Sequence, residues 1–109
     1  MSLLPAVYII TMYITMPNLE KAQEITKALL ESRLIACATM WPCNSMYWWE
    51  NKIQNDTEYI VLAKTSINKY DNLVMKIQEL HPYQVPCILK FDAQANINYA
   101  DWVISEVNK

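Results

Sequence analysis

Two periodicities divide the first part of the chain into a predicted strand and a predicted helix. Residues 6–16, "AVYIITMYITM", are apolar at both alternating positions, which is typical of a central strand covered on both faces. The next stretch repeats apolar side chains at spacings of three and four, at Ala22, Ile25 and Leu29, opposite charged residues. This spacing predicts an amphipathic helix, and Asn18 is placed to cap its first turn.

Two further strands are predicted in the middle of the chain. Residues 34–49, "LIACATMWPCNSMYWW", form the second, and Pro42 indicates a bulge, a bend or an edge position because proline cannot donate to a ladder. The sequence "ENK" supplies a turn. The third predicted strand covers residues 53–65, where Asn55 and Asp56 indicate a local irregularity.

The last third of the chain repeats the alternation of helix and strand. Asn68 is predicted to cap a second amphipathic helix. The corner "HPYQVP" then leads to a fourth strand, residues 87–93. Residues 96–107, "NINYADWVISEV", are predicted to form a short terminal helix with Asn98 and Asp101 at the spacing of a capping box.

The order of these elements is β-α-β-β-α-β with an additional terminal helix. It predicts an α+β, ferredoxin-like domain, in which two helices cover one face of a four-stranded antiparallel sheet. No linker, repeat or low-complexity segment divides the sequence, so residues 1–109 are expected to form a single domain.

One face of this sheet has no predicted cover. Residues 6–16 and 58–65 are apolar or aromatic at both alternating positions, although two helices cover only one face. The second strand adds further large aromatic side chains, which are Trp41, Tyr47, Trp48 and Trp49. Because exposed apolar patches of this size normally mark an interface, we expect oligomerisation through the open face. In the alternative, the terminal helix folds back over that face within the same chain.

The sequence contains no glycine, which excludes several classes of ligand site. Phosphate-binding loops of the P-loop and dinucleotide types need backbone that approaches a phosphate closely and adopts positive φ. Turns must instead use Asn and Asp, the residues that next best tolerate the left-handed region. The candidate turn residues are Asn44, Asn51, Asn55, Asp56 and Asn96.

Charge and cysteine content narrow the compartment and the partners. A net charge of −2 gives no electrostatic reason to expect a nucleic acid or an anionic membrane as partner. Three cysteines, none in a close pair, argue against a disulfide scaffold and predict a reducing, cytoplasmic environment. The uncharged opening before Glu20 lacks a basic segment and contains Pro5 and Pro17, which favours a buried strand over a signal peptide or membrane insertion.

The residues alone give little support to a zinc site. Cys37 and Cys43 are six residues apart along an extended stretch, roughly 20 Å at the rise of a strand, and no C-x-x-C pair exists. His81 and Cys87 are also six apart, although the proline turn can bring them closer. His81 has a structural interpretation too, because an imidazolium is favoured at a helix end and Pro82 stops the helix.

The sequence lacks the motifs of the enzymes and of the RNA-binding modules that share this fold. A hydrolase of the acylphosphatase type needs an Arg in a phosphate-binding loop after the first strand, and "TMPN" supplies none. An RNA-recognition module needs a basic, glycine-containing aromatic signature on the third strand, which "TEYIVLAKT" does not provide. The single histidine has no Ser or Cys adjacent to it in sequence, so spacing predicts no catalytic triad.

Three separated segments resemble the CutA divalent-cation-tolerance proteins. They are "RLIACATMWPCNSMYWWENKI", "EYIVLAKT" and "HPYQVP", in this order, and the resemblance extends from "MPN" to "YADW". It implies homotrimers of ferredoxin-like subunits, similar in architecture to PII-type signal proteins, with a role in tolerance of copper and other divalent cations and without established catalysis. Animal members have been associated with anchoring a membrane-bound esterase, so a scaffolding role through a protein partner is an alternative.

The sequence departs from the family pattern at turns and at expected metal ligands. Asn51, Cys43 and Ala95 replace glycines that are usual in the family. Cys87 stands where a Glu proposed to assist the histidine is common, and Met16 stands where some members have a cysteine. The resemblance therefore implies Met16, His81 and Cys87 as a weak copper site, and a thiol in place of a carboxylate favours Cu(I).

A second set of residues is expected at a cleft between subunits. Glu58 and Lys64 share one face of the third strand by parity, and Trp49, Tyr83 and Cys37 complete the set. In the alternative interpretation, Glu58 and Lys64 form an ion pair across strands or subunits. For Cys37 the alternative is that it packs in the core. The resemblance thus implies a non-enzymatic homotrimer that responds to divalent metal ions and requires no cofactor; the alternative is a PII-like regulator acting through a small ligand or a protein partner.

Overall fold

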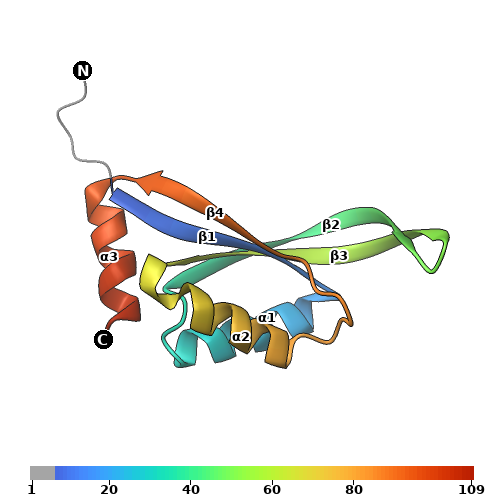
Figure 1. Cartoon of the computed structure of the whole chain (residues 1–109), viewed down its shortest axis with the longest axis horizontal. Coiled ribbons are helices and arrows are strands. Elements are labelled where there is room, and N and C mark those ends of the chain that lie inside the picture. The colour runs from blue at the N-terminus through green and yellow to red at the C-terminus, as the bar shows by residue number, and fades with distance from the viewer. Residues whose placement is uncertain (1–6) are drawn as a thin grey trace, which may run out of the picture.

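The computed structural model describes residues 7–109 and confirms the predicted ferredoxin-like α+β architecture (Figure 1). A four-stranded antiparallel sheet has the order β2-β3-β1-β4. Two helices lie along one of its faces, and a third lies across one end. The elements are β1 Val7–Met16, α1 Leu19–Glu31, β2 Cys37–Trp49, β3 Lys52–Thr65, the 3-10 turn η1 Ile67–Lys69, α2 Tyr70–Leu80, β4 Ile88–Ala95 and α3 Ile97–Val107.

The main core lies between the sheet and the two helices α1 and α2. Strand β1 is central because it pairs with both β3 and β4. Its even-numbered side chains point to the helices, and Met12, Ile14 and Met16 are fully buried there. Helix α1 begins at the predicted cap, where the Asn18 side chain accepts a 2.8 Å hydrogen bond from the Lys21 backbone N–H.

Helix α3 packs on the opposite face of the sheet, at one end only. Its Ala100 and Val103 contact Ile9 in a small second core. The rest of this open face stays uncovered, and Trp41, Leu89 and Phe91 expose 40%, 47% and 51% of their surface. The terminal helix therefore covers part of the face within the same chain, as in the alternative prediction, but leaves most of the apolar surface in contact with solvent.

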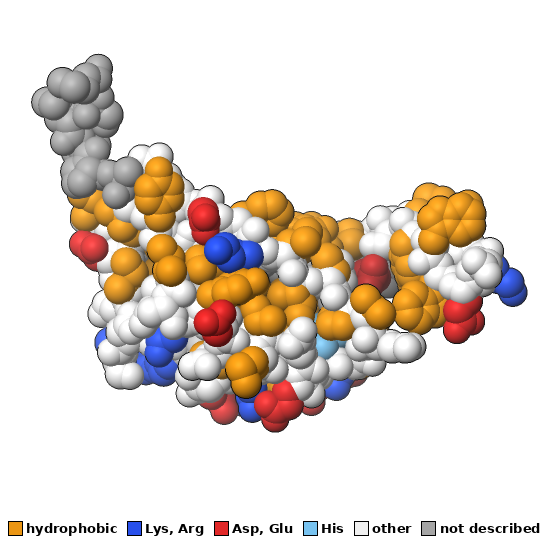
Figure 2. All heavy atoms as spheres, viewed as in Figure 1, with side chains coloured by type: hydrophobic (Ala, Val, Ile, Leu, Met, Phe, Trp, Pro, Cys, Tyr) orange, Lys and Arg blue, Asp and Glu red, His pale blue; other side chains and the backbone are white. Residues whose placement is uncertain are grey.

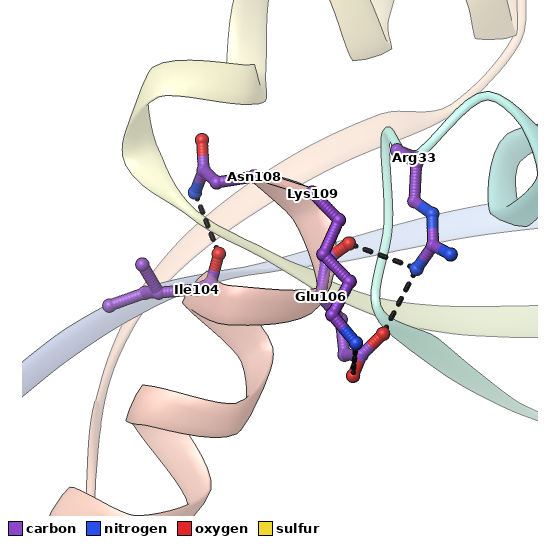
Figure 3. A network of polar contacts seen from close by, with 5 residues as sticks. All are labelled: Arg33, Ile104, Glu106, Asn108 and Lys109. Carbon is purple, nitrogen blue, oxygen red and sulfur yellow. Dashed lines mark hydrogen bonds and ion pairs between the residues drawn. The ribbon is translucent and has the colours of Figure 1, made fainter.

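A polar network fastens the end of α3 to the loop between α1 and β2 (Figure 3). Arg33 Nη1 donates to the backbone oxygen of Glu106 at 3.2 Å and to its carboxylate at 2.9 Å. Lys109 Nζ contacts the other carboxylate oxygen at 2.9 Å. Asn108 Nδ2 donates to Ile104 O at 2.7 Å and so caps the last turn.

The β2–β3 hairpin extends well beyond the helices (Figure 1). Its two-residue turn is Glu50–Asn51, and both residues have positive φ, 52° and 61°, as a type I′ turn requires. Pro42 lies on the edge strand, which confirms one of the three interpretations of that proline. The ladder is continuous from Cys37–Lys64 to Trp49–Lys52, so the predicted irregularity at Asn55 and Asp56 is wrong.

Several other local predictions are wrong. Asn44, Asn55 and Asp56 lie in strands instead of turns. In the β2–β3 ladder, Asn44 pairs with Thr57, Asp56 with Ser45 and Asn55 with Met46. Asn68 lies inside η1, where Ser66 donates to its side chain, so it does not cap α2. Helix α3 begins at Ile97, which places Asn98 in the first turn instead of at the cap. The predicted first strand residue, Ala6, lies outside the described residues.

Candidate functional site

A cleft of about 790 Å³ lies where the hairpin leaves the body of the domain. Strands β1, β2 and β3 form its floor, and the segment between α2 and β4 forms a wall. Its lining is aromatic and acidic, with one thiol, and the side chains that matter for its chemistry are Tyr13, Tyr47, Trp49, Glu58, Tyr83 and Cys87. Figure 2 shows hydrophobic side chains gathered along this side of the molecule and at the tip of the hairpin.

Glu58 is the buried charge of the cleft. It is only 6% exposed, and its Oε2 accepts a 2.5 Å hydrogen bond from the Tyr83 hydroxyl. Burial, followed by this bond to Glu58, raises the pKa of Tyr83 far above its ordinary value. The Tyr83 phenol therefore stays protonated at neutral pH and remains a donor to the carboxylate.

A second tyrosine–carboxylate pair stabilises the hairpin beside the cleft. The Tyr47 hydroxyl donates to Asp56 Oδ2 at 2.5 Å, and this bond raises the pKa of Tyr47. Asn44 Nδ2 donates to Asn55 Oδ1 at 2.7 Å on the same hairpin. Since the two bonds link β2 to β3, they fix two of the strands that form the floor of the cleft.

Both ring nitrogens of His81 are already engaged. Nε2 lies 2.7 Å from Thr15 O, and because a carbonyl only accepts, this nitrogen carries the hydrogen. Nδ1 accepts from the Tyr83 backbone N–H at 3.1 Å. The residue is 8% exposed and ends α2, where its N–H donates to Ile77 O at 2.8 Å. A metal ion would have to displace one of the two ring contacts to reach a lone pair.

The three metal donors implied by the sequence do not converge. Met16 is fully buried in the core on the helix side of the sheet. Cys87 instead lines the cleft together with Tyr13 and Thr15, whose odd numbers place them on the opposite face of β1. Burial, and then the charge of Glu58, raises the pKa of the Cys87 thiol. Within residues 7–109, no three His, Cys, Asp or Glu side chains are arranged to hold one metal ion.

The predicted cleft residues separate into two places. Trp49, Glu58 and Tyr83 line the cleft. Lys64 and Cys37 are paired with each other near the other end of the β2–β3 ladder, and the register places them on the same face of the sheet as Glu58. Six residues of strand keep Lys64 roughly 20 Å from Glu58, so the two charges do not form an intrachain ion pair.

Cys37 belongs to the contact between the sheet and α3. Its sulfur lies 3.2 Å from the Tyr99 hydroxyl. Burial, and then the bond to Cys37, raises the pKa of Tyr99 to about 12. This environment agrees with the alternative interpretation of Cys37 as a packing residue.

Tyr13 and Tyr47 line the cleft and were missed by sequence reasoning. Tyr13 lies in the middle of an apolar strand, and its odd position on β1 is the one signal that places it on the open face. Burial raises its pKa, with smaller contributions from Cys43 and Cys87. Tyr47 was predicted only as part of the exposed aromatic surface, because its bond to Asp56 depends on the hairpin register.

Sequence comparison finds related proteins over most of the chain. Residues 10–106 match the family model described as CutA1 divalent ion tolerance protein. The Divalent-cation tolerance protein CutA of Pyrococcus horikoshii is 42% identical over 101 residues, which cover 92% of this chain and 99% of that protein. Human Protein CutA is 34% identical over 93 residues, 84% of this chain and 52% of that protein.

Solved structures give the same result. The crystal structure of CutA1 from Pyrococcus horikoshii superposes with a TM-score of 0.88 at 40% identity, over 92% of this chain and 99% of that one. The periplasmic divalent cation tolerance protein CutA from Archaeoglobus fulgidus gives 0.88 at 34% identity, over 93% and 99%. None of the helices in residues 7–109 is both long and apolar enough to cross a membrane. The sequence match, the sheet order and the shared fold together assign the chain to the CutA1 divalent ion tolerance family.

Proposed function

We propose that this protein is a non-catalytic homotrimer that takes part in the response to divalent metal ions, with weak copper binding. The observation that carries the proposal is the family match over residues 10–106, which includes the open sheet face and the cleft. Relatives that the chain matches over most of their length are named for divalent-cation tolerance, and that name describes an ion response, not a reaction.

The open face supports association of several copies. Trp41, Leu89 and Phe91 are 40–51% exposed on one side of the sheet, and Trp48 is 71% exposed on the projecting hairpin. A single chain would leave these side chains in water, and contiguous apolar surface of this kind normally marks an interface. Sedimentation tests the proposal: a trimer at micromolar concentration is the expected result, and a monomer would refute it.

Cys87 is the best placed donor for a soft metal ion. Its sulfur lines the cleft near Glu58, whereas Met16 is buried on the other side of the sheet. A thiol must lose its proton to bind a metal, and the raised pKa of Cys87 opposes this at neutral pH. Single-chain binding is therefore weak, and it strengthens as pH rises or when another subunit supplies further ligands.

Calorimetric titration with copper tests direct binding. We expect wild type to bind Cu(I) under reducing conditions, with affinity that increases with pH. Cys87→Ser removes the soft donor and weakens binding, while Cys37→Ser is the matched control because Cys37 lies beside α3. The variant His81→Ala tests separately whether the imidazole of His81 contributes to copper binding in addition to the thiol of Cys87. Absence of binding by wild type below millimolar copper would exclude direct metal sensing.

A second candidate function is a PII-like regulator that acts through a small ligand or a protein partner. The cleft favours it, because a volume of about 790 Å³ with four aromatic side chains is larger than a single ion needs. Pull-down of cell proteins with wild type and with a cleft variant, each with and without added ligand, tests it. A partner that responds to cleft occupancy would favour regulation, whereas an identical set of bound proteins under all conditions would count against it.

The cytoplasm is the proposed compartment. The described residues contain three free cysteines and no disulfide, as is usual in a reducing environment. The Archaeoglobus fulgidus relative is described as periplasmic, so fractionation of the native host is the decisive measurement. Recovery outside the inner membrane would overturn this part of the proposal.

A further inference from the structure

Opposite charges mark the two ends of the open face of the sheet. Glu58 lies at the end nearest the hairpin, and Lys64 lies six residues further along β3, beside α3. Two rows of paired, uncharged side chains cross the sheet between them. These rows are Trp41–Ile60–Thr15 and Thr39–Leu62–Tyr13–Leu89. The two rows therefore form an uncharged strip that has a carboxylate at one end and an ammonium group at the other.

Neither of these two charges is compensated within the chain. Glu58 is only 6% exposed, and its bond from a tyrosine hydroxyl comes from a neutral donor. Lys64 is half-buried. The other members of its row are Cys37, Thr11 and Phe91, and none of them is a carboxylate. No ion pair among the described residues includes Glu58 or Lys64, and roughly 20 Å of strand separates the two. Because burial of a charge is costly unless an opposite charge faces it, each needs a partner from outside the chain.

A second copy of the chain carries the missing partner of each charge. Because the strip has opposite charges at its ends, two strips that meet by unlike ends bring the carboxylate of one copy to the ammonium group of the other. In a closed ring every interface is heterologous, so one such contact forms at each interface and no copy is left without a partner. Glu58 lines the cleft, and the flexible four-carbon stem of a lysine suits an approach through it.

We propose that Lys64 of the partner subunit pairs with Glu58 at every interface between copies of the chain. This inference rests on the proposed homotrimer and names the two residues that set the direction in which its subunits dock. The exposed apolar side chains of the open face supply contact area, but they do not distinguish one docking direction from another. The charges do, because a register that brings two Glu58 side chains or two Lys64 side chains together is penalised by repulsion.

A double-mutant cycle on assembly tests the pair. The variants are Glu58→Gln, which keeps an acceptor for the tyrosine hydroxyl, Lys64→Met, and the two combined. Sedimentation over a series of protein concentrations gives the dissociation constant, in a fixed concentration of urea, which is uncharged and does not screen ion pairs. Each single substitution is expected to weaken assembly about tenfold or more per interface, and the double variant should be no weaker than either one.

A further variant leaves Glu58 unchanged, so that a folding defect at the cleft does not decide the result. Lys64→Glu sets two carboxylates against each other at the interface and should weaken assembly more than Lys64→Met does. Circular dichroism checks that every variant keeps its secondary structure. If Lys64→Glu and Lys64→Met weaken assembly equally, Lys64 does not face an acidic group across the interface and the pair is overturned.

Lys52→Met is the matched control. Lys52 lies six residues from Glu58 in the other direction along β3, on the same face by parity, and it is exposed. Its substitution should be additive with Glu58→Gln, within about threefold in the dissociation constant. Coupling of Glu58 with Lys52 in place of Lys64 would overturn the proposed pair and bring the hairpin of the next copy to the cleft.

The outcomes separate this inference from the function on which it rests. A wild-type monomer would overturn both the trimer and the pair. A wild-type trimer in which Glu58→Gln and Lys64→Met act additively would overturn the pair and leave the trimer standing. Coupling of Glu58 with Lys64, together with additivity of Glu58 and Lys52, is the result expected.

Discussion

The Tyr83 hydroxyl donates a 2.5 Å hydrogen bond to Glu58, and this bond joins the segment after α2 to the middle of β3. The two residues are 25 positions apart in the sequence. The segment that contains Tyr83 is also held by His81, whose Nδ1 accepts from the Tyr83 backbone N–H. Side chain and backbone of one residue thus fix the wall of the cleft to the sheet and to the end of the helix.

Removing the Tyr83 hydroxyl should destabilise the fold through its partner. Tyr83→Phe leaves Glu58 buried without a donor, at a cost of about 1–3 kcal/mol in the free energy of unfolding. Urea denaturation of wild type, Tyr83→Phe, Glu58→Gln and the double variant measures the coupling between the two residues. A favourable coupling near 1 kcal/mol or more is expected, and additive single effects would show that the bond contributes nothing.

Acid should weaken the attachment of α3. The hydrogen bond from Lys109 lowers the pKa of Glu106; burial opposes this, and the charge of Lys109 together with the bond and charge of Arg33 keeps the net shift downward. A carboxylate whose pKa is lower in the folded state stabilises that state above its unfolded pKa, and this contribution disappears as pH falls through the folded value. Glu106→Gln should therefore lower the melting temperature at pH 7, and its effect should shrink as the pH is lowered into the acid range.

The control for this prediction is Glu24→Gln. Glu24 pairs with Lys21 within α1, at an i,i+3 spacing, and its side chain is 67% exposed. It should change the melting temperature less than Glu106→Gln at pH 7. An equal effect of the two variants at neutral and at acid pH would remove the basis for a special role of the α3 network.

The turn of the hairpin can be improved by a single substitution. Glu50 has a φ of 52°, a region that is unfavourable for most residues and better tolerated by Asn. Glu50→Asn should stabilise the protein by about 1 kcal/mol, as expected for the preferred Asn at this position of a type I′ turn. Thermal or urea unfolding measures the gain. Lys52→Asn, in the adjoining strand, is the control and should bring no stabilisation.

Phe91 should report on the assembly. It is 51% exposed on the open face of the sheet, opposite Thr11 on β1. Phe91→Asp places a charge on that surface and is expected to shift the sedimentation coefficient toward that of a monomer while circular dichroism stays unchanged. Met75→Asp is the matched control, since Met75 is 66% exposed but lies on α2. Dissociation by both variants, or by neither, would contradict an interface on the open face.

The periodicity of apolar residues was sufficient to predict the helices and strands, but it was insufficient to predict where each one begins and ends. The helix beginning at Asn18 was predicted correctly, because an N-cap bonds to backbone three residues away and needs no tertiary contact. Asn68 and Asn98 carry the same local signal, but η1 precedes α2, and α3 begins one residue before Asn98. Asn55 and Asp56 resemble turn residues, yet a 13-pair ladder overrides their local preference.

The prediction of the candidate site was limited in the same way. Local patterns indicated which face of a strand a residue lies on, but contacts between distant segments decide which residues come together. Parity correctly placed Glu58 and Lys64 on one face of β3, but parity does not say that the cleft ends before Lys64. Met16 and Cys87 face opposite sides of the sheet, which depends on the register of β4 against β1. The engagement of both His81 nitrogens depends on a contact with Thr15, 66 residues away, that no short motif encodes.

The cleft and the open apolar face are built from the same strand positions. On β3, Glu58 lines the cleft, and Ile60 and Leu62 continue the same face toward Trp41 and Leu89. A molecule that binds the cleft with different affinity in the free and in the associated chain must shift the equilibrium between these two states. Association must then change the affinity for that molecule by the same factor. For the proposed trimer, cleft occupancy and subunit assembly would be thermodynamically reciprocal, so that ligand concentration could be measured as a change in quaternary structure.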